Sequence, residues 1–223
     1  MLPIFACLMM CGTQITVSVD AKAAPEARSE TRFVMTASDP RVRPSNPDYQ
    51  AIAKAVSRAL ATQGFEEARS PDEGALVVLI DWMVSEPKVV ARHQGGDVGA
   101  PTVRGAAAGT KGMPAGGTNN SASFGFGTEP TDRGDLVYTR TVTLKGVDRA
   151  AYTADPAAKG LWEVALKSDG DTDDVPTFAP HMVAAAMPYL ASNAGKVKVM
   201  LGSTEPPVKY VRGDIPVLPV KKQ

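Results

Sequence analysis

The segment that most restricts the possible folds is residues 75–84, which read ALVVLIDWMV. A membrane-spanning helix needs about 20 apolar residues, so this run is too short to cross a bilayer. Its valine and isoleucine favour a strand, and a strand that is apolar at consecutive positions is buried on both faces. The sequence therefore predicts a central strand. We expect Asp81 where this strand leaves the core, because an unpaired buried carboxylate is costly.

A well-marked helix precedes this strand. Asn46 is a favourable N-cap, Pro47 suits the first helical position, and Gly64 suits the C-terminal end. The apolar residues between them recur every three or four positions and form one face: Tyr49, Ile52, Val56 and Leu60. With residues 32–36 as a first strand, this order predicts a βαβ unit with parallel strands and a right-handed crossover.

Three later segments alternate between apolar and polar residues, which is typical of half-buried strands. They are residues 136–145, 161–168 and 196–201. We expect the first two to pair antiparallel, because a short link joins them. Residues 176–191 are rich in alanine and methionine and predict a second helix, which Pro188 kinks or ends.

The predicted fold class is α/β with α+β character: a single mixed β-sheet of about five strands with two main helices. The domain spans residues 32–202, between a polar linker at 24–31 and a proline-rich tail at 203–223. A long glycine-rich insertion interrupts the domain at residues 93–134. Such an insertion is either a flexible surface loop or a hairpin arm whose edges pair with a partner chain.

Residues 1–23 predict a signal peptide, because residues 1–19 carry no charge and the tripeptide AKA ending at Ala23 fits the small-x-small cleavage pattern. Cleavage after Ala23 would leave a periplasmic or otherwise extracytoplasmic protein. The alternative is a lipoprotein signal with Cys11 as the lipid-carrying residue, which would anchor the protein to the outer membrane. The tetrapeptide LMMC ending at Cys11 lacks the small residue expected just before the cysteine.

Charge and cysteine content exclude several classes of function. The 223-residue chain has 24 basic and 24 acidic residues, so it lacks the basic excess of nucleic-acid-binding proteins. Both cysteines, Cys7 and Cys11, lie in the predicted signal peptide. A chain cleaved after Ala23 would have no disulfide, no thiol nucleophile and no cysteine-based metal site.

Two motifs resemble binding loops but depart from the required pattern. Residues 105–111 (GAAAGTK) have three residues between their glycines where a phosphate-binding loop has four, so nucleotide binding is not expected. Asp169, Asp171 and Asp173 alternate like the first ligands of a calcium loop, but the glycine and glutamate of that loop are missing. A solvated turn facing the start of the second helix is the simpler interpretation, and weak calcium binding is the alternative.

The remaining candidates for chemistry are few. His93 and His181 have no carboxylate partner at the spacing of a metal site, and the Gly-x-Ser-x-Gly motif of serine hydrolases is absent. We expect His181 to be a packed or surface residue and Trp162 to lie in the core. The sequence assigns no catalytic, cofactor-binding or metal-binding residue.

Several segments together resemble one family of bacterial envelope proteins. They are SDPRVRP at residues 38–44, ALATQGF at 59–65, ALVVLIDW at 75–82, RTVTL at 140–144, LWE at 161–163 and AAAMPYL at 184–190. This series is similar to the domain of unknown function 4136 family, which groups putative exported proteins and lipoproteins. The resemblance covers roughly residues 33–201. It implies a mixed α/β domain in the periplasm, often tethered by lipid, and implies no activity.

The sequence therefore predicts a non-catalytic cell-envelope protein, periplasmic or lipoprotein-like, with a structural or partner-binding role. We expect an envelope protein partner to contact the insertion at residues 93–134, and the membrane to be reached only through a lipid anchor. No nucleic acid and no cofactor are expected. The alternative is a periplasmic module that binds a small molecule or Ca²⁺, through Asp169, Asp171 and Asp173 or through a pocket near Asp81.

Overall fold

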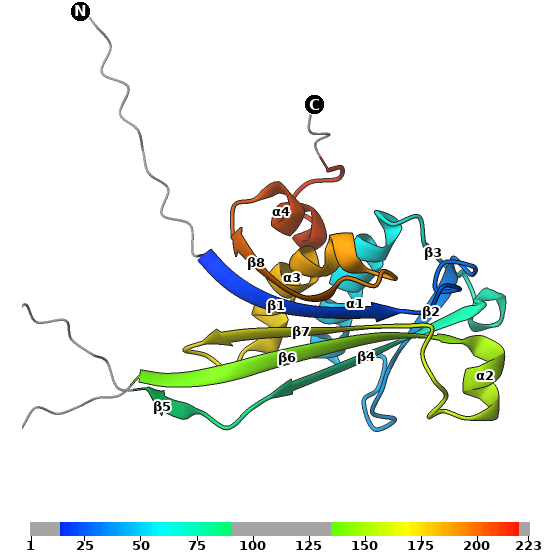
Figure 1. Ribbon diagram of the computed structural model, residues 1–223, viewed down its shortest axis with the longest axis horizontal. Helices are drawn as coiled ribbons and strands as arrows, with labels where there is room; N and C mark the ends of the chain where they lie inside the picture. Colours follow the sequence, from blue (N-terminus) through cyan, green and yellow to red (C-terminus); the bar gives the residue numbers. More distant parts are fainter. Residues whose placement is uncertain (1–13, 91–134, 219–223) are drawn as a thin grey trace, which may run out of the picture. The chain divides into compact units, whose positions relative to one another are not determined.

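The computed structural model describes residues 14–90 and 135–218. These residues form one mixed sheet of eight strands and four α-helices (Figure 1). The strand order is β3-β2-β4-β6-β7-β1-β8, and β5 pairs with β6. The strands are β1 (Gln14–Ala23), β2 (Arg32–Ala37), β3 (Glu66–Glu67), β4 (Leu76–Val84), β5 (Lys88–Val90), β6 (Asp135–Asp148), β7 (Trp162–Gly170) and β8 (Gly195–Gly202). The helices are α1 (Pro47–Ala61), α2 (Arg149–Ala154), α3 (Val175–Ala186) and α4 (Pro206–Arg212).

The chain divides into two compact units, one of residues 1–88 and 136–223 and the other of residues 89–135. Most of the second unit lies outside the described residues. The predictions made for the insertion at residues 93–134 fall there, as do His93 and the GAAAGTK motif.

The sheet is larger than the sequence predicts. The five expected strands are present as β2, β4, β6, β7 and β8, with β2 parallel to β4 and β6 antiparallel to β7 as predicted. The prediction of about five strands is wrong, because the sheet has eight in the described residues. Two of the additional strands, β3 and β5, are only two and three residues long and have no periodicity that a sequence could show.

The third additional strand, β1, lies where the sequence predicts the end of a signal peptide. It is an inner strand, antiparallel to β7 on one side and to β8 on the other. Its apolar side chains alternate with polar ones and are buried: Ile15, Val17, Val19 and Ala21. The predicted domain boundary at residue 32 is therefore corrected, since residues 14–23 belong to the sheet. The expected linker at residues 24–31 is a turn that buries Ala27.

The two predicted helices are confirmed, and so are the residues predicted to cap the start of the first and to end the second. Asn46 Oδ1 accepts hydrogen bonds from the backbone N–H groups of Asp48 and Tyr49, at 2.9 and 3.1 Å, and so caps α1. The second predicted helix is α3, and Pro188 lies in the short 3₁₀ turn that follows it. In the part of the chain that the structure describes, no helix is both long and apolar enough to span a membrane.

Two further helices lie in segments expected to be a link and a tail. α2 lies in the connection between β6 and β7. α4 lies in the predicted proline-rich tail, where it packs on α1 and α3 and buries Val208 and Val211. Arg58 of α1 donates a hydrogen bond to the Tyr210 carbonyl oxygen at 2.9 Å, which joins α4 to the domain. The prediction that residues 203–223 form a tail is therefore corrected, because residues 206–212 form the helix α4.

The two faces of the sheet have different environments. Helices α1, α3 and α4 lie on one face (Figure 1). Inward-facing side chains on that side form the main core, among them Val17, Phe33, Val78, Leu144, Trp162 and Leu166. On the opposite face α2 lies beside β4, where Val77, Leu79 and Val147 form a smaller apolar cluster. The rest of that opposite face carries the candidate site.

Candidate functional site

The open face is the surface of β6, β7, β1 and β8 that points away from α1, α3 and α4. Side chains alternate along a strand and directly paired residues share a face, so the pairing register fixes which residues lie there. Each of them is exposed or partly exposed, whereas the intervening residues of β6, β7 and β1, on the helix-covered side, are buried. They are Thr141 and Thr143 of β6, Ala165 and Lys167 of β7, Ser18 and Asp20 of β1, and Lys196 and Lys198 of β8.

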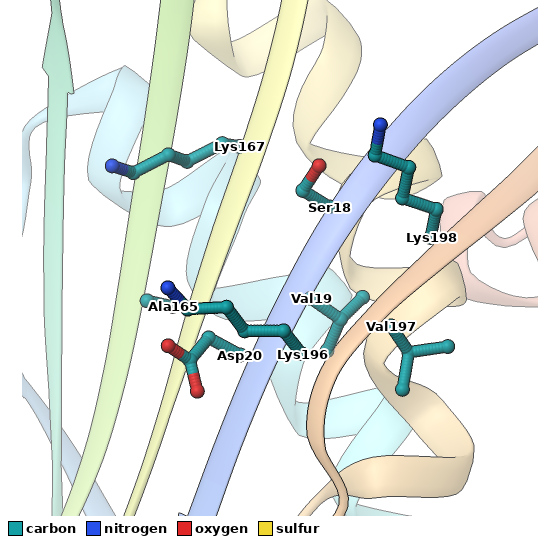
Figure 2. Close-up of a pocket in the computed structure, with 8 residues that line it drawn as sticks. All are labelled: Ser18, Val19, Asp20, Ala165, Lys167, Lys196, Val197 and Lys198. Atoms are coloured by element: carbon teal, nitrogen blue, oxygen red, sulfur yellow. The ribbon is translucent and has the colours of Figure 1, made fainter.

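A hollow of about 420 Å³ lies on the open face, over β7, β1 and β8 (Figure 2). Cross-strand pairing sets its two rows. In one row Ser18 is paired with Lys167 on one side and with Lys198 on the other. In the next row Asp20 is paired with Ala165 and with Lys196. The small side chains of Ser18 and Ala165 leave room between the long side chains around them.

The lysines of the hollow are directed differently. Figure 2 shows Lys196 lying across β1 towards Asp20 and Ala165, and Lys198 extending from β8 towards β1. Lys167 points away from β1 in the same view. Asp20 also has the ammonium group of Lys22 at 4.0 Å, and that lysine is largely exposed. The residues that line the hollow therefore carry three positive charges and one negative charge, a net of 3 − 1 = +2.

A buried polar cluster lies on the opposite, helix-covered side of the sheet. Arg140 of β6 is 1% exposed, its cross-strand partner Ser168 is 2% exposed, and His181 of α3 is 6% exposed. Among the described residues, no hydrogen-bond partner faces Arg140 Nε or Nη1, Ser168 Oγ or either ring nitrogen of His181. Instead, the guanidinium carbon of Arg140 lies 3.7 Å from the centre of the Phe178 ring, which is a cation–π contact.

Burial shifts the pKa of both basic groups in this cluster. Desolvation lowers the pKa of Arg140, while the nearby carboxylates of Asp171, Asp169 and Asp174 oppose that shift. Desolvation is also the main cause that lowers the pKa of His181, and the positive charges of Arg212 and Arg140 add to it. Both effects favour the neutral form of His181. The sequence-based expectation of a packed histidine is confirmed by its burial.

The acidic turn at residues 169–174 does not converge on one point. Asp169 accepts a hydrogen bond from the Thr139 hydroxyl at 2.7 Å, on the open face. Asp174 caps α3 by accepting from the Thr177 backbone N–H at 3.1 Å, and hydrogen bonding to Thr177 lowers its pKa. Within residues 14–90 and 135–218, no group of three or more His, Cys, Asp or Glu residues could hold a metal ion. For Asp174, the prediction of a carboxylate at the start of the second helix is confirmed.

Two other sequence-based placements are confirmed. Asp81 is exposed where β4 leaves the core, in register with Thr143 on the open face. Trp162 is 1% exposed and packs in the main core. Arg140 was not predicted to be a buried charge, although it stands on the apolar side of an alternating strand. The lysine hollow was not predicted either, because Ser18 lies in the predicted signal peptide and the lysines meet only through the strand register.

Comparisons with protein-family models and with curated proteins find no match. Two solved structures show limited similarity. One is a PDZ domain protein from Parabacteroides distasonis ATCC 8503, 13% identical, with a TM-score of 0.44; the match covers 86% of this chain and 40% of that protein. The chain thus spans less than half the length of that protein. The other is a PelC dodecamer from Paraburkholderia phytofirmans, 10% identical, with a TM-score of 0.37; the match covers 79% of this chain and 98% of PelC.

Proposed function

We propose that this protein is a non-catalytic domain of the bacterial cell envelope that binds an anionic partner on the open face of its sheet. The observation that carries the proposal is the hollow on that face, which is lined by Lys167, Lys196 and Lys198 together with Ser18 and Asp20. Elsewhere in the domain, three helices pack on the other side of the sheet and bury an extensive apolar core. The polar open face is therefore the surface best suited to a partner.

Two observations support a binding role over catalysis. Ser168 of β7 and His181 of α3, a possible nucleophile and base, are both more than nine-tenths buried. A nucleophile and its base must reach the substrate, and these two side chains face the core. Lys167, Lys196 and Lys198 are instead exposed on the open face, where a partner can reach them. Positive charge on an open sheet suits recognition of an anion.

The position of β1 supports membrane anchoring through Cys11 over release by cleavage after Ala23. Cleavage after Ala23 would remove the strand that joins β7 to β8. It would also remove the buried side chains of Ile15, Val17 and Val19, worth on the order of 5 kcal/mol together, a large part of the stability of a typical domain. Processing at Cys11 leaves β1 intact, because that cysteine precedes Gln14. The resemblance to exported lipoproteins agrees with this proposal.

The mass of the mature protein from fractionated cells tests the location. We expect a membrane-associated chain that begins at Cys11 and carries the added mass of lipid. A soluble chain beginning at Ala24 would contradict both the anchor and the place of β1 in the mature domain.

Photo-crosslinking in intact cells tests the binding surface. A photo-reactive amino acid replaces Thr143 on the open face or, as the matched control, Lys54, which is exposed on α1. We expect defined crosslinked products from position 143 and few from position 54. Equal products from both positions would contradict the assignment of the open face.

A further inference from the structure

We infer that the hollow on the open face binds a phosphoryl group, with Lys198 and Lys196 supplying the charge, Ser18 supplying a hydroxyl and Lys167 closing the third side. This inference rests on the proposed function for the choice of surface, and it names the chemistry of the ligand. The residues come from three adjacent strands and are brought together by the pairing of Ser18 with both Lys167 and Lys198.

The spacing of the strands allows the ammonium groups to converge. Neighbouring strands lie about 4.8 Å apart, so the Cα atoms of Lys167 and Lys198 on either side of Ser18 are about 10 Å apart. A lysine side chain has a flexible four-carbon stem and three rotatable donors. Two such side chains can therefore place their ammonium groups on one anion above Ser18. Lys198 already extends towards β1, and Lys167 needs only a change of rotamer in an exposed side chain.

The charge distribution favours a doubly charged anion. The lining residues carry a net charge of 3 − 1 = +2. The one carboxylate, Asp20, lies near the ammonium group of Lys22, at 4.0 Å, which reduces its repulsion of a bound anion. No arginine lines the hollow. Bidentate recognition by a guanidinium group is therefore not available there, and the lysines can bind phosphate as point charges from several directions.

The size of the hollow fits a phosphoryl group together with part of the molecule that carries it. Its volume is about 420 Å³, and pockets for small ligands occupy roughly 300–1,000 Å³. Ala165 and the strand backbone at Val19 and Val197 supply the floor. A phosphoryl group is present both in soluble phosphorylated molecules and in lipid headgroups, so the test must separate these sources.

The test uses the full-length chain made by cell-free synthesis, where envelope processing does not occur. One probe is inorganic pyrophosphate, with binding followed by NMR shifts of the Ser18 and Lys198 amide groups at constant ionic strength. The other probe is flotation with vesicles of phosphatidylcholine alone or with 30% phosphatidylglycerol. Only the difference between the two vesicles is used, so any general affinity of the N-terminal segment for lipid cancels.

Three variants accompany the wild-type chain. Lys196→Gln combined with Lys198→Gln removes the two charges directed at β1. Lys196→Arg combined with Lys198→Arg keeps a positive charge at both positions. Lys54→Gln removes one charge from the helix-covered side and is the matched control. All the replaced side chains are exposed, and an unchanged thermal midpoint confirms that each variant folds.

We expect the glutamine pair to weaken binding of the responsive probe at least tenfold, while Lys54→Gln changes it less than twofold and the arginine pair retains it. A response to pyrophosphate identifies a soluble phosphate as the source, and a response only to phosphatidylglycerol identifies a headgroup. Binding of neither probe, or equal loss in Lys54→Gln, would overturn the inference. If crosslinks from position 143 persist in that case, the binding surface stands and only the phosphoryl ligand is wrong.

Discussion

The guanidinium group of Arg140 and the ring of Phe178 form a cation–π pair, with 3.7 Å between Cζ and the ring centre. Arg140 belongs to β6 and Phe178 to α3, so the pair joins the sheet to that helix. A close fit surrounds it, because a Cβ atom on Gly170 would fall only 2.2 Å from Arg140 Nη2. Nε and Nη1 of Arg140 have no hydrogen-bond partner in the described residues. The Phe178 ring and the carboxylates of the turn after β7 are therefore the main groups that stabilise its buried charge.

A double-mutant cycle measures that support. We expect Arg140→Met to change the free energy of unfolding by less than about 1 kcal/mol, because a buried charge whose Nε and Nη1 lack hydrogen bonds costs roughly what its contacts return. Phe178→Ala should destabilise by about 2 kcal/mol and by less in the Arg140→Met background. The expected coupling is about 1–2 kcal/mol. Additive effects in urea denaturation would contradict a cation–π role for Phe178.

The lowered pKa of His181 predicts that the folded protein loses stability in mild acid. Its pKa is lowered in the folded state, mainly by burial, so below the ordinary histidine value of 6.5 the unfolded chain binds more protons. Stability is therefore fully present above pH 6.5 and falls as the pH drops towards the lowered folded pKa. We expect the free energy of unfolding to fall between pH 7.5 and 5.5 by more in the wild type than in His181→Gln. Parallel pH profiles for the two proteins would rule out this role.

Replacement of Gly146 by any larger residue is predicted to disturb the core. A Cβ atom there would lie 2.2 Å from Nε1 of the buried Trp162, its cross-strand partner. We expect Gly146→Ala to destabilise by about 1–3 kcal/mol, because the indole must shift within a close-packed core. Gly202→Ala is the control, since its new methyl group would meet nothing closer than 3.6 Å. Equal melting temperatures for both variants would show that Trp162 moves freely.

If β1 is retained in the mature protein, substitutions at two neighbouring positions should change its stability to very different extents. Val17 is fully buried and Thr16 is exposed on the open face. We expect Val17→Asp to destabilise the protein isolated from cells by more than about 3 kcal/mol, because it buries an unpaired charge. Thr16→Asp should change stability by less than about 0.5 kcal/mol. If residues 1–23 were removed on export, both variants would yield a mature protein identical to the wild type.

Elements with strong local signals were predictable from the sequence. Asn46 and Pro47 mark the start of α1, and the continuous apolar run of β4 and the alternation of β7 mark buried and half-buried strands. The fold class follows from their order. The position of β1 was also readable, because Ile15, Val17, Val19 and Ala21 alternate with polar residues. The lack of charge in residues 1–19 and the AKA tripeptide ending at Ala23 favour a signal peptide in the same segment, and so conceal the strand.

The candidate site could not be predicted in the same way. Lys167 and Lys198 are 31 positions apart in the sequence, 198 − 167, and they become neighbours only because β1 lies between β7 and β8. Such register depends on long-range pairing, which no local pattern encodes. Arg140 was missed for a related reason, since its burial depends on Phe178 and on the turn that follows β7.

The central claim is that the lysines of the open face hold a partner in the cell envelope. It is tested most directly by photo-crosslinking from position 143 in intact cells, with and without the Lys196→Gln and Lys198→Gln pair. We predict defined crosslinked products in the wild-type background and their loss in the double variant, at equal protein levels. Products that persist undiminished in the double variant would contradict the claim.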